Sequence, residues 1–203
     1  PRRRLSNWIT RNLVLAGNFN MTNVAELFDL LVGIGQCPKE KSDTMTVLEK
    51  IGHYLDVEND RLRQIHAPLG ETDAQLTRLI GEQLDVAGIL RMSAQDFDGG
   101  YAFAGLIGHG DAFVLRDPAG IRPCFWYADE EFVVAASERP AIQTAFAVRT
   151  EQVHELRPGH ALIVRKDGTF SEEQVRVPVE KRACSFERIY FSRGSDRDVY
   201  RER

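Results

Sequence analysis

The sequence has few of the features that indicate a disulfide-rich, metal-binding or membrane protein, and its small number of cysteines is the clearest example. Only three cysteines occur among its 203 residues, at Cys37, Cys124 and Cys184. An odd number at wide spacing predicts neither a disulfide framework nor a local metal-binding motif, and it is typical of a reducing compartment. We therefore predict a cytoplasmic protein and no metal ligands in this chain.

Long hydrophobic runs and a strong charge of one sign are also absent. No apolar segment approaches the roughly 20 residues of a membrane-spanning helix. Residues 2–4 are arginines that lead into a mixed polar segment, unlike a signal peptide. The formal net charge of −4 gives no electrostatic reason to bind nucleic acid or an anionic membrane. These features predict neither nucleic acid nor membrane as a partner.

What is present is the composition of an ordinary globular domain, with 43% hydrophobic and 28% charged residues. In the first half, the spacing of apolar residues predicts one strand followed by helices. Asn12–Ala16 predicts a short buried strand that ends at Gly17. Asn23, with Glu26 three positions later, predicts a helix that begins with a capping box.

Apolar residues at helical spacing predict two further helices. The second should begin at Asp43, and the third should occupy about 72–90. The charged segment 57–70 between them predicts an irregular connection.

From Gly99 onwards, short β-rich segments alternate with turn-forming residues. Helices followed by mostly hairpin-linked strands predict an α+β fold with antiparallel sheet. One short helix at about 138–146 should interrupt the strands. The predicted strands cover 101–107, 111–115, 124–128, 132–136 and 161–165.

Ala16–Asn23 is the first of three segments that combine residues in ways that indicate chemistry. Here a strand end leads through a polar turn into a helix. Such a turn can expose backbone N–H groups and an amide side chain together, which is how an oxyanion is stabilised. On the residues alone, the simpler interpretation is a helix cap preceded by an Asx-turn.

The other two segments are Arg116–Pro123 and Phe186–Asp196. In the former, Arg116, Asp117 and Arg122 surround a turn that contains Pro and Gly. These charges can form a buried ion-pair network that fixes the turn, or a site for an anion, and the Pro and Gly favour the structural role. In the latter, aromatic and charged residues crowd together after the last predicted strand, which suits an interface with another domain.

In this order the segments resemble one family, the class II (N-terminal-nucleophile) glutamine amidotransferases of the amidophosphoribosyltransferase type. That family has an Ala-His-Asn-Gly-Asn-Leu-Thr-Asn strand end, an aspartate-led helix and an Arg-Asp-Pro-x-Gly-Ile-Arg-Pro turn. It then has a Ser-Glu helix start, a Pro-Gly turn and a Glu-x-x-Tyr-Phe-x-Arg segment. The counterparts here are Ala16–Asn23, Ser42-Asp43, Arg116–Pro123, Ser137-Glu138, Pro158-Gly159 and Glu187–Arg193. The last segment favours the phosphoribosyl enzymes over asparagine synthetases and glucosamine-phosphate synthases, which share the glutaminase fold.

The resemblance implies an N-terminal-nucleophile hydrolase-like fold, a four-layer sandwich of two antiparallel sheets between helical layers, incomplete at the N-terminus. It implies that an N-terminal cysteine attacks the side-chain amide of glutamine, with its own α-amino group as base. By position, the oxyanion donors are the Asn18 side chain and the Phe19 N–H, and Asp43 holds the α-ammonium of glutamine. Ammonia then passes to phosphoribosyl pyrophosphate on a separate domain and forms phosphoribosylamine, in the first committed step of purine biosynthesis.

The chain departs from the family pattern in two places. Phe19 stands where the family has glycine, and Gly17 stands where it has histidine. The backbone donor at 19 therefore requires that phenylalanine adopt the needed conformation. Position 1 is proline, and the three cysteines are internal, so none can use its own α-amino group as base. We expect this polypeptide alone not to hydrolyse glutamine.

The family layout implies a partial glutaminase domain over 1–180 and, over 181–203, a segment that joins an absent phosphoribosyltransferase domain. The family uses magnesium with phosphoribosyl pyrophosphate. Some members hold an iron–sulfur cluster with one ligand near Cys184 and the others beyond Arg203, so no cofactor is expected in this chain. Open sheet edges predict a homo-oligomer or an aggregate. Two alternatives stay open: a non-catalytic regulatory or interaction module, supported by Phe19, and catalysis by Pro1 itself.

Overall fold

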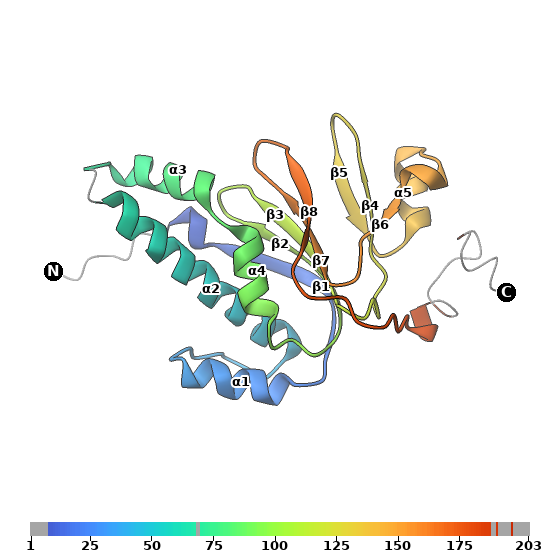
Figure 1. Ribbon diagram of the computed structural model, residues 1–203, viewed down its shortest axis with the longest axis horizontal. Coiled ribbons are helices and arrows are strands. Elements are labelled where there is room, and N and C mark those ends of the chain that lie inside the picture. Colours follow the sequence, from blue (N-terminus) through green and yellow to red (C-terminus); the bar gives the residue numbers. More distant parts are fainter. Residues whose placement is uncertain (1–7, 68–69, 188–189, 191–195, 197–203) are drawn as a thin grey trace.

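The computed structural model describes residues 8–67, 70–187, 190 and 196, which form two antiparallel sheets with helices on both outer sides (Figure 1). This is the predicted α+β class. No helix in the described part of the chain is long and apolar enough to cross a membrane. The helices are η1 (Ile9–Arg11), α1 (Val24–Gly33), α2 (Asp43–His66), α3 (Asp73–Gln83), α4 (Val86–Ala94), α5 (Arg139–Phe146) and η3 (Thr150–Gln152).

The larger sheet has five strands in the order β1-β2-β3-β7-β8, and the smaller sheet has three in the order β5-β4-β6. All adjacent pairs are antiparallel. The larger sheet consists of β1 (Leu13–Met21), β2 (Gly99–Ile107), β3 (Ala112–Arg116), β7 (His160–Val164) and β8 (Phe170–Gln174). The smaller consists of β4 (Phe125–Ala128), β5 (Val133–Ala136) and β6 (His154–Glu155).

The main core lies between the larger sheet and helices α1–α4. Alternate residues of a strand face the same side, and on β2 this side carries Tyr101 and Phe103, which are at most 1% exposed. Their rings lie 5.5 Å apart, and Phe113 of β3 meets Phe103 at 6.4 Å. The helices contribute the facing apolar residues, among them Leu27, Val47, Ile51, Leu55, Ile80 and Leu90.

The opposite face of the larger sheet looks toward the smaller sheet, and only part of it is packed. Cys124, Leu156 and Leu162 form a small buried cluster between the sheets. On the same face, Val14 is 66% exposed and Leu106 51% exposed. The space between the sheets is therefore partly open.

Helix α5 covers the far side of the smaller sheet, where Ile142 packs with Tyr127 and Val153. The layers thus run from helices α1–α4 through the two sheets to α5 (Figure 1). This order confirms the predicted four-layer sandwich.

Helix α2 begins at Asp43 as predicted, with Ser42 accepting the N–H of Met45 at 3.4 Å. The predicted irregular connection over 57–70 is wrong, because α2 continues to His66. Asn59 is fully buried in this part and exchanges hydrogen bonds with Thr10 (2.6 and 3.1 Å). Asn59 is a polar residue on the buried face, so it interrupts the apolar spacing that would indicate a helix. Its hydrogen-bonding partner, Thr10, lies in η1.

The single helix predicted over 72–90 is two helices. Helix α3 ends at Gln83, and Asp85 starts α4 by accepting the N–H of Gly88 at 2.8 Å. The start of α1 after Asn23 is confirmed, but the predicted capping box is wrong. Asn23 instead donates to the carbonyl of Asp96 at 2.8 Å, so a tertiary contact replaces the local one.

Candidate functional site

The prediction that the first strand ends at Gly17 is wrong. Strand β1 continues to Met21 and pairs residue for residue with β2. The predicted polar turn is therefore strand, and Asn18 and Phe19 lie within it. Because β1 stands at the end of the strand order, its outer edge has no partner strand within the described residues.

Gly17 stays in the strand because the facing strand occupies the space of a side chain. A Cβ at Gly17 would lie 2.3 Å from the Cβ of Phe103 and 2.6 Å from the carbonyl oxygen of Ala102. The ring of Phe103 stacks on that of Phe19, with centroids 5.2 Å apart. The small residue at 17 and the large residue at 19 thus pack around one ring of β2. Phe19 needs no left-handed backbone, since Ala147 is the only described non-glycine residue with positive φ.

Asn18 and Phe19 point to opposite faces of the sheet, as successive strand residues must. Phe19 packs into the core under the helices. Asn18 lines a cleft of about 360 Å³ between the two sheets, together with Arg122, Ser137 and Glu187. The predicted oxyanion amide therefore faces a space in which a substrate group can lie.

The backbone N–H of Phe19 points toward the outer edge of β1. In an antiparallel pair, the N–H groups of one strand alternate between the partner and the outside. The N–H of Thr22 donates to the carbonyl of Asp98 at 3.0 Å. The backbone N–H groups of the even-numbered residues of β1 therefore point to β2. The backbone N–H of Met21 points to the outer edge and donates to Oδ2 of Asp43 at 3.2 Å. The structure thus brings the Phe19 N–H and Asp43 to the same edge.

Asp43 is the first residue of α2, where the helix dipole favours a negative charge. Its contact with Met21 uses Oδ2, and the other carboxylate oxygen is the candidate acceptor for an ammonium group.

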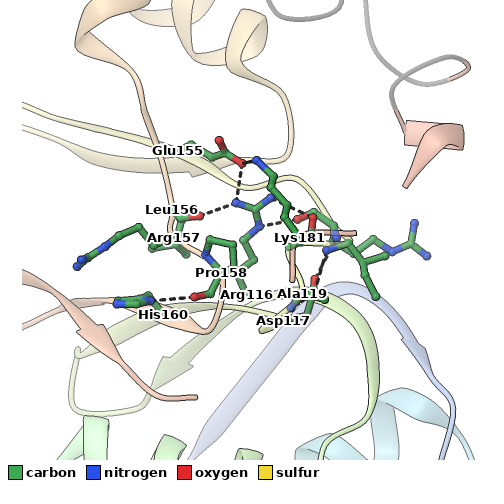
Figure 2. A network of polar contacts seen from close by, with 12 residues as sticks. Arg116, Asp117, Ala119, Glu155, Leu156, Arg157, Pro158, His160 and Lys181 are labelled. Atoms are coloured by element: carbon green, nitrogen blue, oxygen red, sulfur yellow. Dashed lines mark hydrogen bonds and ion pairs between the residues drawn. The ribbon is translucent and has the colours of Figure 1, made fainter. Parts of the chain in front are cut away.

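A turn beside the cleft is held by Asp117, which is fully buried. Its carboxylate accepts the backbone N–H groups of Ala119, Ile121 and Arg122 at 3.0, 2.9 and 3.0 Å. Figure 2 shows Asp117 pointing back into the turn that it closes. The structural role predicted for Arg116–Pro123 is confirmed in this contact.

Arg116 is 2% exposed and also supports this turn. Figure 2 shows its side chain among the groups that it contacts. It donates to the carbonyl oxygens of Arg122 (2.7 Å) and Leu156 (2.5 Å) and to Oε1 of Glu155 (2.9 Å). Burial opposes ionisation of Glu155, but hydrogen bonds from Lys181 and Arg116 outweigh it and hold the pKa of this carboxyl below its ordinary value. The ion pair therefore joins the turn to β6.

Glu187 connects the turn to β1. Its Oε1 accepts a hydrogen bond from Nη1 of Arg122 at 2.5 Å and from Nδ2 of Asn18 at 3.3 Å. The side chains of Glu187 and Arg122 are 13% and 18% exposed. Sequence reasoning places Glu187 in the segment that leads to another domain and does not predict this contact, because Glu187 lies 169 residues from Asn18.

Cys124 lines the same cleft but is 3% exposed. Burial raises the pKa of its thiol to about 11. It is therefore protonated at neutral pH and is a weak nucleophile. Cys37 is exposed and Cys184 is half-buried.

The described residues contain no group of three or more His, Cys, Asp and Glu side chains placed to hold a metal ion. We therefore assign no metal ligand among them.

The predicted interface at 186–196 lies partly outside the described residues, at 188–189 and 191–195. Phe186 and Tyr190 are 68% and 76% exposed, with ring centroids 6.3 Å apart. An interface there stays a prediction.

No family model matches the chain. It is 31% identical over 187 residues to the amidophosphoribosyltransferase of Pasteurella multocida, a match over 89% of this chain and 33% of that protein. It is 28% identical over 182 residues to the Bacillus subtilis amidophosphoribosyltransferase, over 90% of this chain and 32% of that one.

A solved structure of glutamine phosphoribosylpyrophosphate amidotransferase from B. subtilis, complexed with ADP and GMP, superposes with a TM-score of 0.61 at 26% identity. The superposition covers 89% of this chain and 33% of that chain. The chain therefore spans about a third of the length of the relatives that it matches. By sequence and by fold, this chain is similar to a part of the amidophosphoribosyltransferases.

Proposed function

We propose that this chain is the glutaminase part of an amidophosphoribosyltransferase. The complete enzyme hydrolyses glutamine to glutamate and ammonia, and passes the ammonia to phosphoribosyl pyrophosphate to form phosphoribosylamine and pyrophosphate. The observation that carries the proposal is the placement of the candidate residues on β1. Asn18 faces the cleft, while the Phe19 N–H and Asp43 share the outer edge.

In this proposal, a cysteine thiolate attacks the carbonyl carbon of the glutamine amide, and a tetrahedral oxyanion forms. The Asn18 amide and the Phe19 N–H donate to that oxyanion, and Asp43 holds the α-ammonium of the substrate. Oxyanion donors act mainly in the transition state, and removal of one lowers kcat by about 100- to 1,000-fold. The extended backbone of Phe19 supports the donor, because an N–H at the outer edge is available whatever side chain packs into the core.

The test is glutamate release from glutamine by the complete protein encoded by the reading frame that contains this chain, with phosphoribosyl pyrophosphate present. We expect Asn18→Ala to lower kcat by about 100-fold or more with little change in KM. Asp43→Asn should mainly raise the KM for glutamine, because it removes a contact made in both ground and transition states. Asn20→Ala is the matched control, since Asn20 lies on the same strand and faces the same side as Asn18.

The alternative is a non-catalytic module with the same fold, and the replacement of the family glycine by Phe19 is the observation that favours it. In that case the complete protein makes no glutamate, with or without phosphoribosyl pyrophosphate. Glutamate formation that is lost in Asn18→Ala rejects the module.

We further propose that the 203-residue chain alone does not turn over glutamine, because Cys124 is buried and protonated and all three cysteines are internal. Residues 1–180 would form the glutaminase part, and residues 181–203 would lead to the phosphoribosyltransferase domain. Magnesium would bind with phosphoribosyl pyrophosphate on that domain. The complete enzyme would be cytoplasmic. Incubation of the isolated chain with glutamine tests the first point, and measurable glutamate would contradict it.

Self-association is the last proposal. Val14 and Leu106 expose apolar surface on the sheet face, and the outer edge of β1 has no partner strand among the described residues. We expect light scattering to show oligomers of the isolated chain, and a stable monomer would contradict this.

A further inference from the structure

Three of the segments that carry the resemblance to the family meet at one carboxylate. Asn18 belongs to the first, Arg122 to the second and Glu187 to the third. Oε1 of Glu187 accepts from both Nδ2 of Asn18 and Nη1 of Arg122. Nothing in the proposed chemistry requires a carboxylate at this point, so the contact needs its own explanation.

Arg122 is a fixed support for Glu187. Its N–H donates to the buried Asp117 at 3.0 Å, and its carbonyl accepts from the buried Arg116 at 2.7 Å. Both contacts hold its main chain, so its guanidinium projects from a rigid turn. With a side chain only 13% exposed, Glu187 is thereby held in position beside the cleft.

An asparagine amide has two orientations of nearly the same shape, and they present opposite chemistry. One places the NH₂ donors toward a given point, and the other places the carbonyl acceptor there. An oxyanion is stabilised only by the donor orientation. A carboxylate accepts but does not donate, so Glu187 favours the orientation in which Nδ2 of Asn18 faces it. The NH₂ group carries two hydrogens, which leaves the second one for a substrate oxyanion.

We propose that Glu187 is a positioning residue that holds the Asn18 amide with its N–H donors directed into the cleft. This inference rests on the proposed glutaminase function. Glu187 does not touch the substrate; it acts through Asn18, and Arg122 keeps it in place. The segment that leads toward the C-terminus thereby takes part in the glutaminase site.

The test uses the complete protein and the isosteric variant Glu187→Gln. The glutamine side chain can turn its carbonyl to Arg122 and its NH₂ group to Asn18, which favours the wrong amide orientation. We expect kcat for glutamate formation to fall about tenfold, with KM for glutamine unchanged within about twofold, because an oxyanion donor acts on the transition state. Glu187→Asp, which keeps the charge, should restore part of the loss. Glu180→Ala, a change of an exposed acidic residue in the same part of the chain, is the control and should leave kcat unchanged.

A double-mutant cycle separates positioning from a merely structural role. If Glu187 acts only through Asn18, then Glu187→Gln in the Asn18→Ala background causes no further loss of kcat. Multiplicative losses in the double variant overturn the proposal. A raised KM together with a lowered melting temperature in Glu187→Gln overturns it as well.

An independent readout keeps this inference distinct from the proposed function. In the protein labelled with ¹⁵N at asparagine side chains, the Asn18 amide is assigned by its disappearance in Asn18→Ala. We expect its two proton shifts to be widely split by the carboxylate and to converge in Glu187→Gln. An unchanged Asn18 signal refutes the proposal. If the wild-type protein makes no glutamate, the glutaminase function fails, and this signal alone decides whether Glu187 orients Asn18.

Discussion

Replacement of Asp117 tests whether a single buried carboxylate holds the turn that carries Arg122. The carboxylate is fully buried and accepts three backbone N–H groups at 2.9–3.0 Å. Asp117→Ala leaves all three donors without this acceptor. The N–H of Ala119 is buried, whereas those of Ile121 and Arg122 are partly reached by water.

The magnitude follows from the loss of these bonds. An unsatisfied buried donor costs about 1–3 kcal/mol. Taking about 2 kcal/mol for Ala119 and about 1 kcal/mol for each partly buried donor, Asp117→Ala should lower the free energy of unfolding by about 4 kcal/mol. Asp117→Asn retains Oδ1 for two donors and turns an NH₂ group toward the N–H of Arg122, so its loss should be about 2 kcal/mol.

The assay is urea unfolding of the wild type and both variants, with the free energy taken from the midpoint and the slope. Asp167→Ala is a matched control, because Asp167 also accepts a turn N–H, that of Thr169 at 2.9 Å, but does so at an exposed hairpin. Its midpoint should move far less. Equal losses for Asp117→Ala and Asp117→Asn, or midpoints no lower than that of the control, would refute the reasoning.

Three other predictions concern packing, ionisation and thiol reactivity. Gly17→Ala should lower stability by about 2 kcal/mol or more, because its Cβ meets the facing backbone, whereas Gly33→Ala, with open space around it, should not; thermal unfolding compares the two. The pKa of Glu155 is lowered in the folded state, so its ion pairs stabilise the fold at pH values above its pKa in the unfolded chain. This stabilisation is lost as the pH falls through the pKa of Glu155 in the folded protein. The melting temperature of Glu155→Gln should therefore lie below that of the wild type near pH 7 and approach it in acid. Iodoacetamide at pH 8 should label the exposed Cys37 and spare Cys124, whose thiol pKa is about 11; mass spectrometry of peptides shows which residue reacts, and rapid labelling of Cys124 in the folded protein would contradict its burial.

Much of the local structure could be predicted from the sequence, because it rests on short-range chemistry. The start of α2 follows from Ser42 as cap, and the β-hairpins of the second half follow from apolar alternation between turn formers. The structural role of the Arg116–Pro123 turn was also predictable, since Pro and Gly specify backbone shape. The order of these motifs alone indicates the same proteins to which the comparisons find the chain similar.

What sequence reasoning misjudged are features that depend on a distant partner. Gly17 is a local signal for a strand end, but pairing with β2 overrides it and uses the missing side chain to admit Phe103. In the same way, the charged end of α2 is helical because Asn59 forms a hydrogen bond with Thr10, which lies 49 residues earlier in the sequence. Local propensity is weaker than the tertiary contacts that oppose it in both places.

The sequence by itself determined which residue types stand in the candidate site, namely the amide at 18, the carboxylate at 43 and the turn charges at 116, 117 and 122. Only the tertiary structure decided how they meet. The pleat of β1 sends Asn18 into the cleft and the Phe19 ring into the core, while the pairing with β2 leaves the Phe19 N–H at the edge that Asp43 reaches. The contact of Glu187 with Asn18 has no local signal, because the two residues are neighbours only after the sheets have packed and the turn has formed.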